Sequence, residues 1–139
     1  MPMEPKKWKY GAHEWEFEPP DILHCYVHGP VFLPDAQTSL QIMQEIAPAI
    51  GGQPFFVAYM NDGSFPPETR KFFGDITPCW KAIVVVGGSP MIRATTNLLV
   101  RASAILSGKE AVTKAVKTIE EGRAWMEDFR QKDKAAKTP

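Results

Sequence analysis

Two histidines and a tyrosine at alternate positions are the side chains best suited to acid–base chemistry: His24, Tyr26 and His28. Alternate residues of a β-strand point to one face, so a strand through this segment places all three on the same side of a sheet. The two histidines would lie about 13 Å apart, too far to share a metal ion, and a metal site would need His13 or an acidic residue from elsewhere. Imidazole titrates near neutral pH, so a pH switch is one interpretation. We favour the other, a partly exposed strand face with no further role.

A second candidate is the turn at residues 87–90, Gly-Gly-Ser-Pro, directly after an apolar run. Backbone N–H groups at the start of a helix point outward and the helix dipole favours negative charge, so this turn could bind a nucleotide or another anion. It matches neither GxGxxG nor GxxxxGK[ST], and Pro90 removes one donor. We favour plain helix capping, with Ser89 as the N-cap.

No recognisable catalytic set can be assembled from the sequence. We find no serine–histidine–aspartate order, no paired carboxylates and no reactive-cysteine neighbourhood. Cys25 and Cys79 are far apart and outside any CxxC spacing, which favours small apolar packing roles in a reducing compartment. We therefore expect no catalytic residues, no metal and no cofactor, and a protein that is not an enzyme.

Hydrophobic periodicity predicts the elements that would position these residues. Two unbroken apolar runs, 55–60 and 82–86, are typical of strands buried on both faces of a sheet. The alternation from Gly11 to Glu18 indicates a half-exposed strand at an antiparallel edge. The full set comprises strands at 11–18, 22–28, 55–60, 82–86 and 111–117, and helices at 34–50, 66–73, 90–106 and 118–131. This order predicts a small three-layer α/β domain, with a mixed, mostly parallel sheet of about five strands and helices on both faces.

Composition limits the function classes. The 139 residues carry 16 basic and 16 acidic side chains, so no overall positive charge attracts nucleic acid. No apolar run is long enough for a membrane span, and no secretion signal is visible, so we expect a cytoplasmic protein. We expect residues 1–10 to be a flexible lead, 11–131 the domain, and 132–139 a polar tail.

Two short motifs carry a family resemblance. They are Gly87-Gly88-Ser89-Pro90 followed by Met91-Ile92-Arg93, and Thr118-x-Glu120-Glu121-Gly122-x-Ala124-Trp125-Met126. With the order of elements they make most of the chain resemble the SpoIIAA-like proteins of the STAS superfamily. That resemblance implies a small mixed sheet flanked by helices. It also implies a non-catalytic module, active in signalling through partner binding or ligand sensing.

The same resemblance suggests a modification site. Anti-sigma-factor antagonists of the superfamily are phosphorylated on a serine at the start of the helix after a central strand, within a pattern like Asp-Ser-Ser/Thr-Gly. Residues 61–67 read Asn-Asp-Gly-Ser-Phe-Pro-Pro here, so Ser64 takes roughly that position, without the second hydroxyl and the glycine. A phosphate would add nearly two negative charges. A turn or cap role for Ser64 is the alternative.

Three functions are consistent with these observations. The leading one is a regulatory or interaction module that binds a protein partner, or a second copy of itself as a homodimer. The contact would be made by the helices after the second and third inner strands, at 66–73 and 90–106. The second is a small apolar-ligand or lipid-binding protein using the phenylalanine-rich residues 65–73. The third is an enzyme or nucleotide-binding protein using the turn at residues 87–89. The candidate surface residues are Ser64, Phe65, Arg70, Phe72, Phe73, Ser89, Met91 and Arg93.

Overall fold

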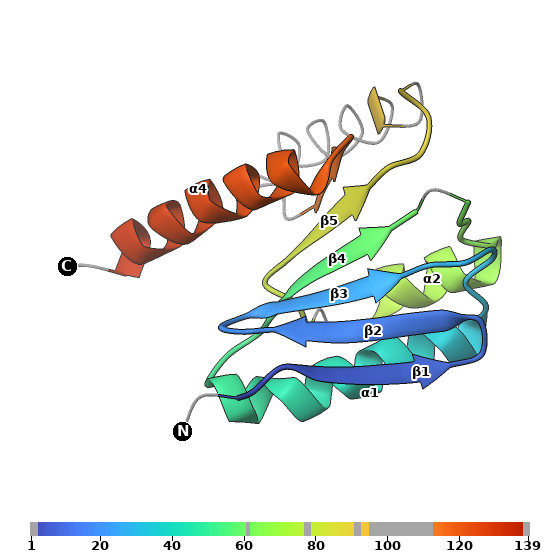
Figure 1. Cartoon of the computed structure of the whole chain (residues 1–139), viewed down its shortest axis with the longest axis horizontal. Coiled ribbons are helices and arrows are strands. Elements are labelled where there is room, and N and C mark those ends of the chain that lie inside the picture. Colours follow the sequence, from blue (N-terminus) through green and yellow to red (C-terminus); the bar gives the residue numbers. More distant parts are fainter. Residues whose placement is uncertain (1–2, 61, 77–78, 91–92, 95–112, 138–139) are drawn as a thin grey trace.

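A computed structural model of the chain describes residues 3–60, 62–76, 79–90, 93–94 and 113–137 (Figure 1). In these residues six strands form one sheet whose spatial order is the order of the chain. The strands are β1 (Lys6–Tyr10), β2 (His13–Glu18), β3 (Ile22–Tyr26), β4 (Phe55–Tyr59), β5 (Ala82–Val86) and β6 (Thr113–Val116). The mixed α/β architecture expected from the sequence is therefore confirmed, with one strand more than the five predicted.

The additional strand is β1, which pairs antiparallel with β2. Residues 6–10, expected to be part of a flexible lead, are thus a strand, and β2 is not the edge of the sheet. β2 also pairs antiparallel with β3, whereas β3, β4, β5 and β6 are mutually parallel. The predicted alternation in β2 is confirmed, because His13, Trp15 and Phe17 are buried and Glu14 is exposed.

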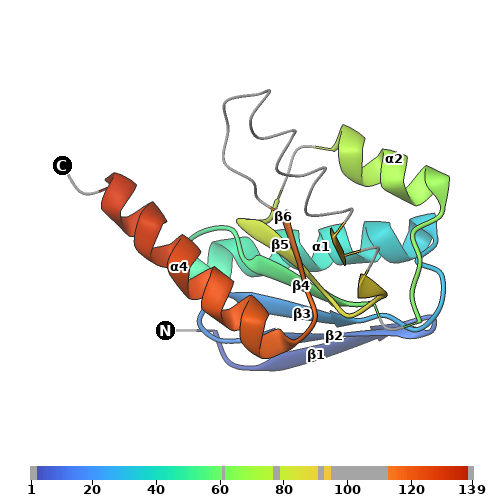
Figure 2. The ribbon, with the colours of Figure 1, turned by 90° about the horizontal axis from the view of Figure 1, so that it is seen from above.

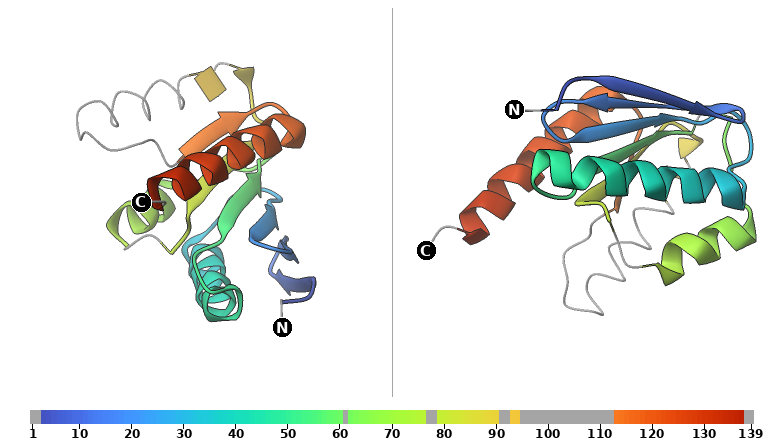
Figure 3. Two further views of the ribbon diagram at one scale, coloured as in Figure 1. Left: turned by 90° about the vertical axis from the view of Figure 1, so that its left-hand side faces the viewer. Right: turned by 90° about the horizontal axis from the view of Figure 1, so that it is seen from below.

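Helices cover both faces of the sheet, as predicted. The helices α1 (Leu33–Ile50) and α2 (Pro67–Asp75) lie on one face, and α4 (Ile119–Lys137) lies on the other (Figures 2 and 3). Consecutive crossovers β3–α1–β4 and β4–α2–β5 put both helices on the same side, as one crossover hand requires when strands are added in one direction. The helix predicted at residues 90–106 falls almost wholly outside the described residues.

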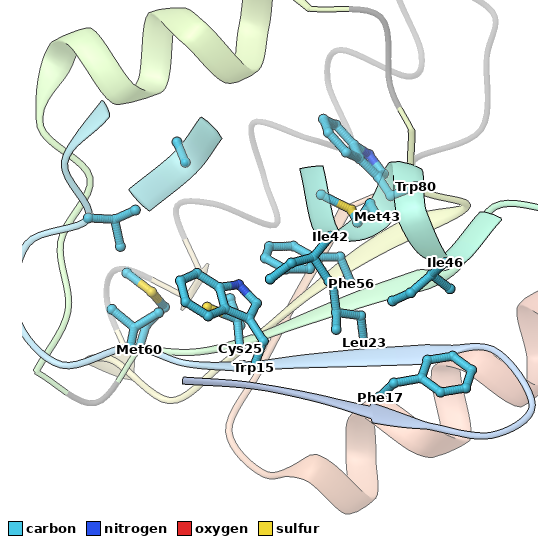
Figure 4. Packing of buried hydrophobic residues seen from close by; sticks show 14 residues of the cluster. Trp15, Phe17, Leu23, Cys25, Ile42, Met43, Ile46, Phe56, Met60 and Trp80 are labelled. Carbon is cyan, nitrogen blue, oxygen red and sulfur yellow. The ribbon is translucent and has the colours of Figure 1, made fainter. Parts of the chain in front are cut away.

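The larger core lies between the sheet and α1. Trp15, Leu23 and Phe56 from the strands meet Met43 and Ile46 of α1 (Figure 4). The indole of Trp15 donates a hydrogen bond to the hydroxyl of Ser39, 3.0 Å away, so its polar atom is satisfied inside the core. This packing holds β2, β3 and β4 against α1.

A buried histidine joins β2 to the start of α1. The backbone N–H of His28 donates to Nδ1 of His13 at 3.1 Å, so the ring proton is on Nε2. That nitrogen lies 3.2 Å from the carbonyl oxygen of Pro30 and 3.3 Å from Oδ2 of Asp35. Asp35 also accepts the N–H of Phe32 at 2.9 Å and so caps α1. His13 and Asp35 thus hold the β1–β2 turn, the loop after β3 and α1 together.

The residue before α4, Thr118, caps the helix. The N–H of Glu121 donates to the hydroxyl of Thr118 at 3.3 Å. Gly122 then packs tightly on the sheet, since a Cβ there would lie 3.0 Å from a methyl group of Val84. The helix continues through Lys137, so residues 132–137 of the expected polar tail are helical. None of the helices in the described residues is long and apolar enough to span a membrane.

Candidate functional site

An apolar hollow of about 220 Å³ lies between α2 and the sheet, and we call it the α2 hollow. Its described lining residues are Phe65, Arg70 and Phe73 from α2 and the preceding loop, Phe56 and Ala58 from β4, Ile83 and Val85 from β5, and Thr113 of β6. The volume exceeds the ~150 Å³ of a cavity that binds benzene and falls below the ~300 Å³ where drug-sized sites begin. The hollow is therefore in the size range of a small aromatic molecule.

Aromatic rings build one wall of the α2 hollow. Phe73 contacts Phe65 edge to face with ring centroids 6.1 Å apart, and it contacts Trp80 at the same distance. Phe72 packs against Phe73 at 5.6 Å but does not line the hollow itself. Two residues of the predicted surface, Phe65 and Phe73, are thus brought together by the fold, with Phe72 supporting them.

Strand alternation supplies the opposite wall. Ile83 and Val85 point to the α1 and α2 side of β5, and both are only half-buried. The other face of β5, formed by Ala82, Val84 and Val86, is buried under α4. β5 was expected to be equally buried on both faces, and the hollow is the reason that it is not.

Arg70 contributes the charge at the α2 hollow. Arg70 is exposed to solvent and also lines the hollow. The preceding residue anchors the helix, because the buried hydroxyl of Thr69 donates to the carbonyl oxygen of Val31 at 2.7 Å. Arg70 is therefore held at a fixed place on a tethered helix.

Ser64 lies in the loop before α2 and is exposed. Its carbonyl oxygen accepts the N–H of Val31 at 2.9 Å, which ties this loop to the one after β3. Pro66, and not Ser64, occupies the N-cap of α2. Phosphorylation of Ser64 stays a prediction.

The turn at residues 87–90 has the geometry of a tight strand-to-helix connection. Gly87 and Gly88 have φ of 93° and 80°, values that glycine adopts without strain. The guanidinium of Arg93 donates to the carbonyl oxygen of Gly88, and the N–H of Arg93 donates to the carbonyl oxygen of Ser89 at 3.0 Å. This contact explains why a cation stands in the first helical turn. Met91 lies outside the described residues.

A hydrogen-bonded group of polar side chains, which we call the tyrosine relay, lies on the opposite face of the sheet from the α2 hollow. The hydroxyl of Tyr59 is 2.9 Å from Nδ1 of His24, and Nε2 of His24 is 3.1 Å from Oε1 of Glu18. Arg123 of α4 binds both oxygens of Glu18, at 2.7 and 2.8 Å. Tyr26 stacks on Tyr59 with ring centroids 4.8 Å apart. The relay therefore joins β2, β3, β4 and α4.

The charges of the relay follow from these contacts. Hydrogen bonds from Arg123, the largest cause, and from His24 outweigh burial and lower the pKa of Glu18 to about 2. Glu18 is thus a carboxylate at neutral pH, and Nε2 of His24 must be the donor to it. Burial, with a smaller effect of Tyr26, raises the pKa of Tyr59 to about 12, while Arg123 opposes the rise.

The sequence placed His24 and Tyr26 of the relay on one strand face, which is confirmed, but it did not point to Glu18, Tyr59 or Arg123. His24 is 3% exposed, so the expected partly exposed strand face is wrong for this residue, and His28 lies beyond the end of β3. His13 lies on the α1 side and cannot join His24 in a metal site. Residues 18, 24, 59 and 123 come from four separate elements. Alternation along 55–60 puts Tyr59 on the same face as Val57, but the register that puts it beside Tyr26 is known only from the structure.

Comparison with known proteins identifies the fold. No protein-family model matches the chain, and no curated protein does either. A solved structure does match: an uncharacterised protein of the DUF3478 family with a SpoIIAA-like fold, from Shewanella loihica PV-4. The TM-score is 0.54 at 10% sequence identity, over 90% of this chain and 97% of that one. The chain therefore has a SpoIIAA-like fold, as its motifs and order of elements predicted.

Proposed function

We propose that this protein is a ligand-sensing module that binds a small apolar molecule in the α2 hollow. The observation that supports the proposal is the hollow itself, which is lined by phenylalanine and aliphatic side chains. Sites for small molecules are largely apolar and pre-formed, with few polar groups to orient the ligand. Arg70 at the opening favours a ligand whose outer end is anionic. The module works in the cytoplasm, where its two free thiols stay reduced.

Methyl-resolved NMR with 1-naphthol and 1-naphthoate as probes tests this function. Either probe should shift the methyl signals of Ile83 and Val85, which line the hollow, and leave those of Val84 and Val57 on the other face unchanged. The residues of β5 thus provide an internal control one position apart. Equal shifts on both faces, or no shift at millimolar probe, would contradict the proposal.

Two variants sharpen the test. Ile83→Phe should fill the hollow and abolish binding of both probes. Arg70→Gln should weaken the binding of naphthoate about tenfold, because one charge-assisted hydrogen bond of ~1.5 kcal/mol is lost. The binding of naphthol should not change. Lys71→Gln is the matched control, since Lys71 is equally exposed on α2 but pairs with Asp75 and does not line the hollow.

A second candidate function, binding of a protein partner or self-association, is favoured by a different observation. Phe32 and Tyr10 are large apolar residues that are 53% and 46% exposed. Exposed aromatic residues are typical of contact surfaces. Light scattering over a concentration series should show a dimer that Phe32→Ser removes, and a strict monomer with no partner in a pulldown would rule this function out.

A further inference from the structure

The tyrosine relay has the atomic order of a nucleophile with its base. Because Glu18 is a carboxylate, Nε2 of His24 carries a proton and donates it to Oε1 across 3.1 Å. In neutral His24 the lone pair of Nδ1 then accepts the phenolic proton of Tyr59 across 2.9 Å. Hydroxyl, imidazole and carboxylate are thus connected in the sequence that acyl-transfer enzymes use, with tyrosine in place of serine.

We propose that Tyr59 is a nucleophile that accepts an acyl group from small activated carboxylic esters, with His24 as its general base. The Oη atom of Tyr59 attacks the ester carbonyl carbon while its proton moves to Nδ1 of His24. The bond between that carbon and the leaving alkoxide or aryloxide breaks, and the leaving group departs with its electron pair. The proton on Nδ1 then passes to the leaving group or to water, and Tyr59 is left as an O-acyl ester.

The ionisation of Tyr59 makes the base necessary. A phenol with a pKa of about 12 is un-ionised at neutral pH, so its attack depends on proton removal during the reaction, as it does for a serine hydroxyl. Arg123 supports the same step, because its positive charge stabilises negative charge on the Tyr59 oxygen. Glu18 holds the ring of His24 in the required tautomer and is a positioning residue.

The place of Tyr59 suits a site of this kind. It is the last residue of β4, at the carboxyl ends of the parallel strands where open α/β sheets bind their ligands. It is half-buried, and the half-buried ring of Tyr26 stacks beside it at 4.8 Å, an aromatic surface for an aryl ester. The site lies on the opposite sheet face from the α2 hollow, so this activity is independent of ligand binding there.

Tyr26 provides a matched control within the same molecule. It lies opposite Tyr59 in the pairing of β3 with β4, and burial raises its pKa as well. It stacks on His24 at 6.2 Å between ring centroids, whereas the ring nitrogens of His24 bond Tyr59 and Glu18. The two tyrosines thus share their surroundings, but Tyr59 is the one whose hydroxyl is hydrogen-bonded to the proposed base His24.

The test is reaction of the full chain with p-nitrophenyl acetate at neutral pH, with p-nitrophenol release followed by absorbance and the acetylated peptide identified by mass spectrometry. We expect a burst of about one equivalent and acetyl on Tyr59. Tyr59→Phe should lose the burst, and Tyr26→Phe should keep it. His24→Gln should slow acetylation about 100-fold, the usual contribution of a general base.

His24 is buried, so its variant needs a check that does not depend on folding. In the unaltered chain, acetylation of Tyr59 should exceed that of Tyr26 at least tenfold, because of the two tyrosines only Tyr59 is hydrogen-bonded to a ring nitrogen of His24. Equal acetylation of both tyrosines, or acetyl on lysines alone, would overturn the proposal.

Discussion

The adjacent residues His24 and Cys25 of β3 point to opposite faces of the sheet and differ in their chemical environment. Cys25 points to the α1 side, where burial raises the pKa of its thiol to about 12, so it stays a thiol and packs as an apolar residue, as expected from the sequence. His24 points to the α4 side and joins the tyrosine relay. A single residue step in a strand therefore separates an inert group from an interacting one.

At the residue scale, the Glu18–Arg123 pair makes stability depend on pH. The folded-state pKa of Glu18 is about 2, below its ordinary value of 4.5, so the pair stabilises the fold above pH 4.5 and stops doing so as the pH falls toward 2. Because both side chains are partly exposed, we expect Arg123→Gln to cost about 1 kcal/mol or less at pH 7. Denaturant unfolding should show that loss at pH 7 and little of it at pH 2.

The Glu18 carboxyl carbon gives a direct readout of the same pair. Its NMR titration midpoint should rise toward 4.5 in Arg123→Gln. Lys71→Gln, which removes an exposed pair with Asp75, should change neither quantity. A midpoint for Glu18 that does not move would mean that Arg123 is not its main partner in solution.

At the element scale, the sequence predicted the elements with strong periodicity. The apolar runs of β4 and β5 could be placed because strands inside a sheet covered by helices leave an unbroken apolar pattern. β1 could not, because Trp8 is the one residue of KKWKY that packs on the core, and the outer edge of the strand faces solvent. The last turns of α4 were missed because exposed pairs such as Lys132–Asp128 stabilise a helix without an apolar face.

The tyrosine relay and the α2 hollow could be predicted only in part from the sequence. Phe65, Arg70 and Phe73 could be named because they cluster in the chain. Their partners from β4 and β5 could not be named as hollow lining, since alternation assigns a face but not what fills the space above it. Contacts between side chains of different elements require the register of the sheet, which no local pattern specifies.

Asp35 controls the entry into α1. Asp35→Ala removes the acceptor for the N–H of Phe32 and one contact of the buried His13, and we expect a loss of about 1–2 kcal/mol in the free energy of unfolding. Asp35→Asn keeps an acceptor oxygen and should lose less. Glu45→Ala on the exposed side of the same helix should cost under ~0.5 kcal/mol, and an equal cost at both positions would contradict the capping role.

At the scale of the whole molecule, β1 protects the edge of the sheet. A chain that starts at Gly11 would lose the packing of Trp8 on the core and expose the unpaired backbone edge of β2. We expect a lower denaturant midpoint and self-association visible by light scattering. Trp8→Ser, which keeps the strand, should lower the midpoint without association. A truncated chain that is monomeric and equally stable would show that residues 6–10 are dispensable.

The agreement between chain order and strand order has a consequence for assembly. Each strand from β2 to β6 is added beside the one that precedes it, so no later segment has to enter between two strands already paired. The sheet can therefore grow in one direction while the chain is still being synthesised, with each new strand finding a ready template. Tyr26 and Tyr59 come together once β4 has docked, and α4, which brings Arg123, packs on this face last.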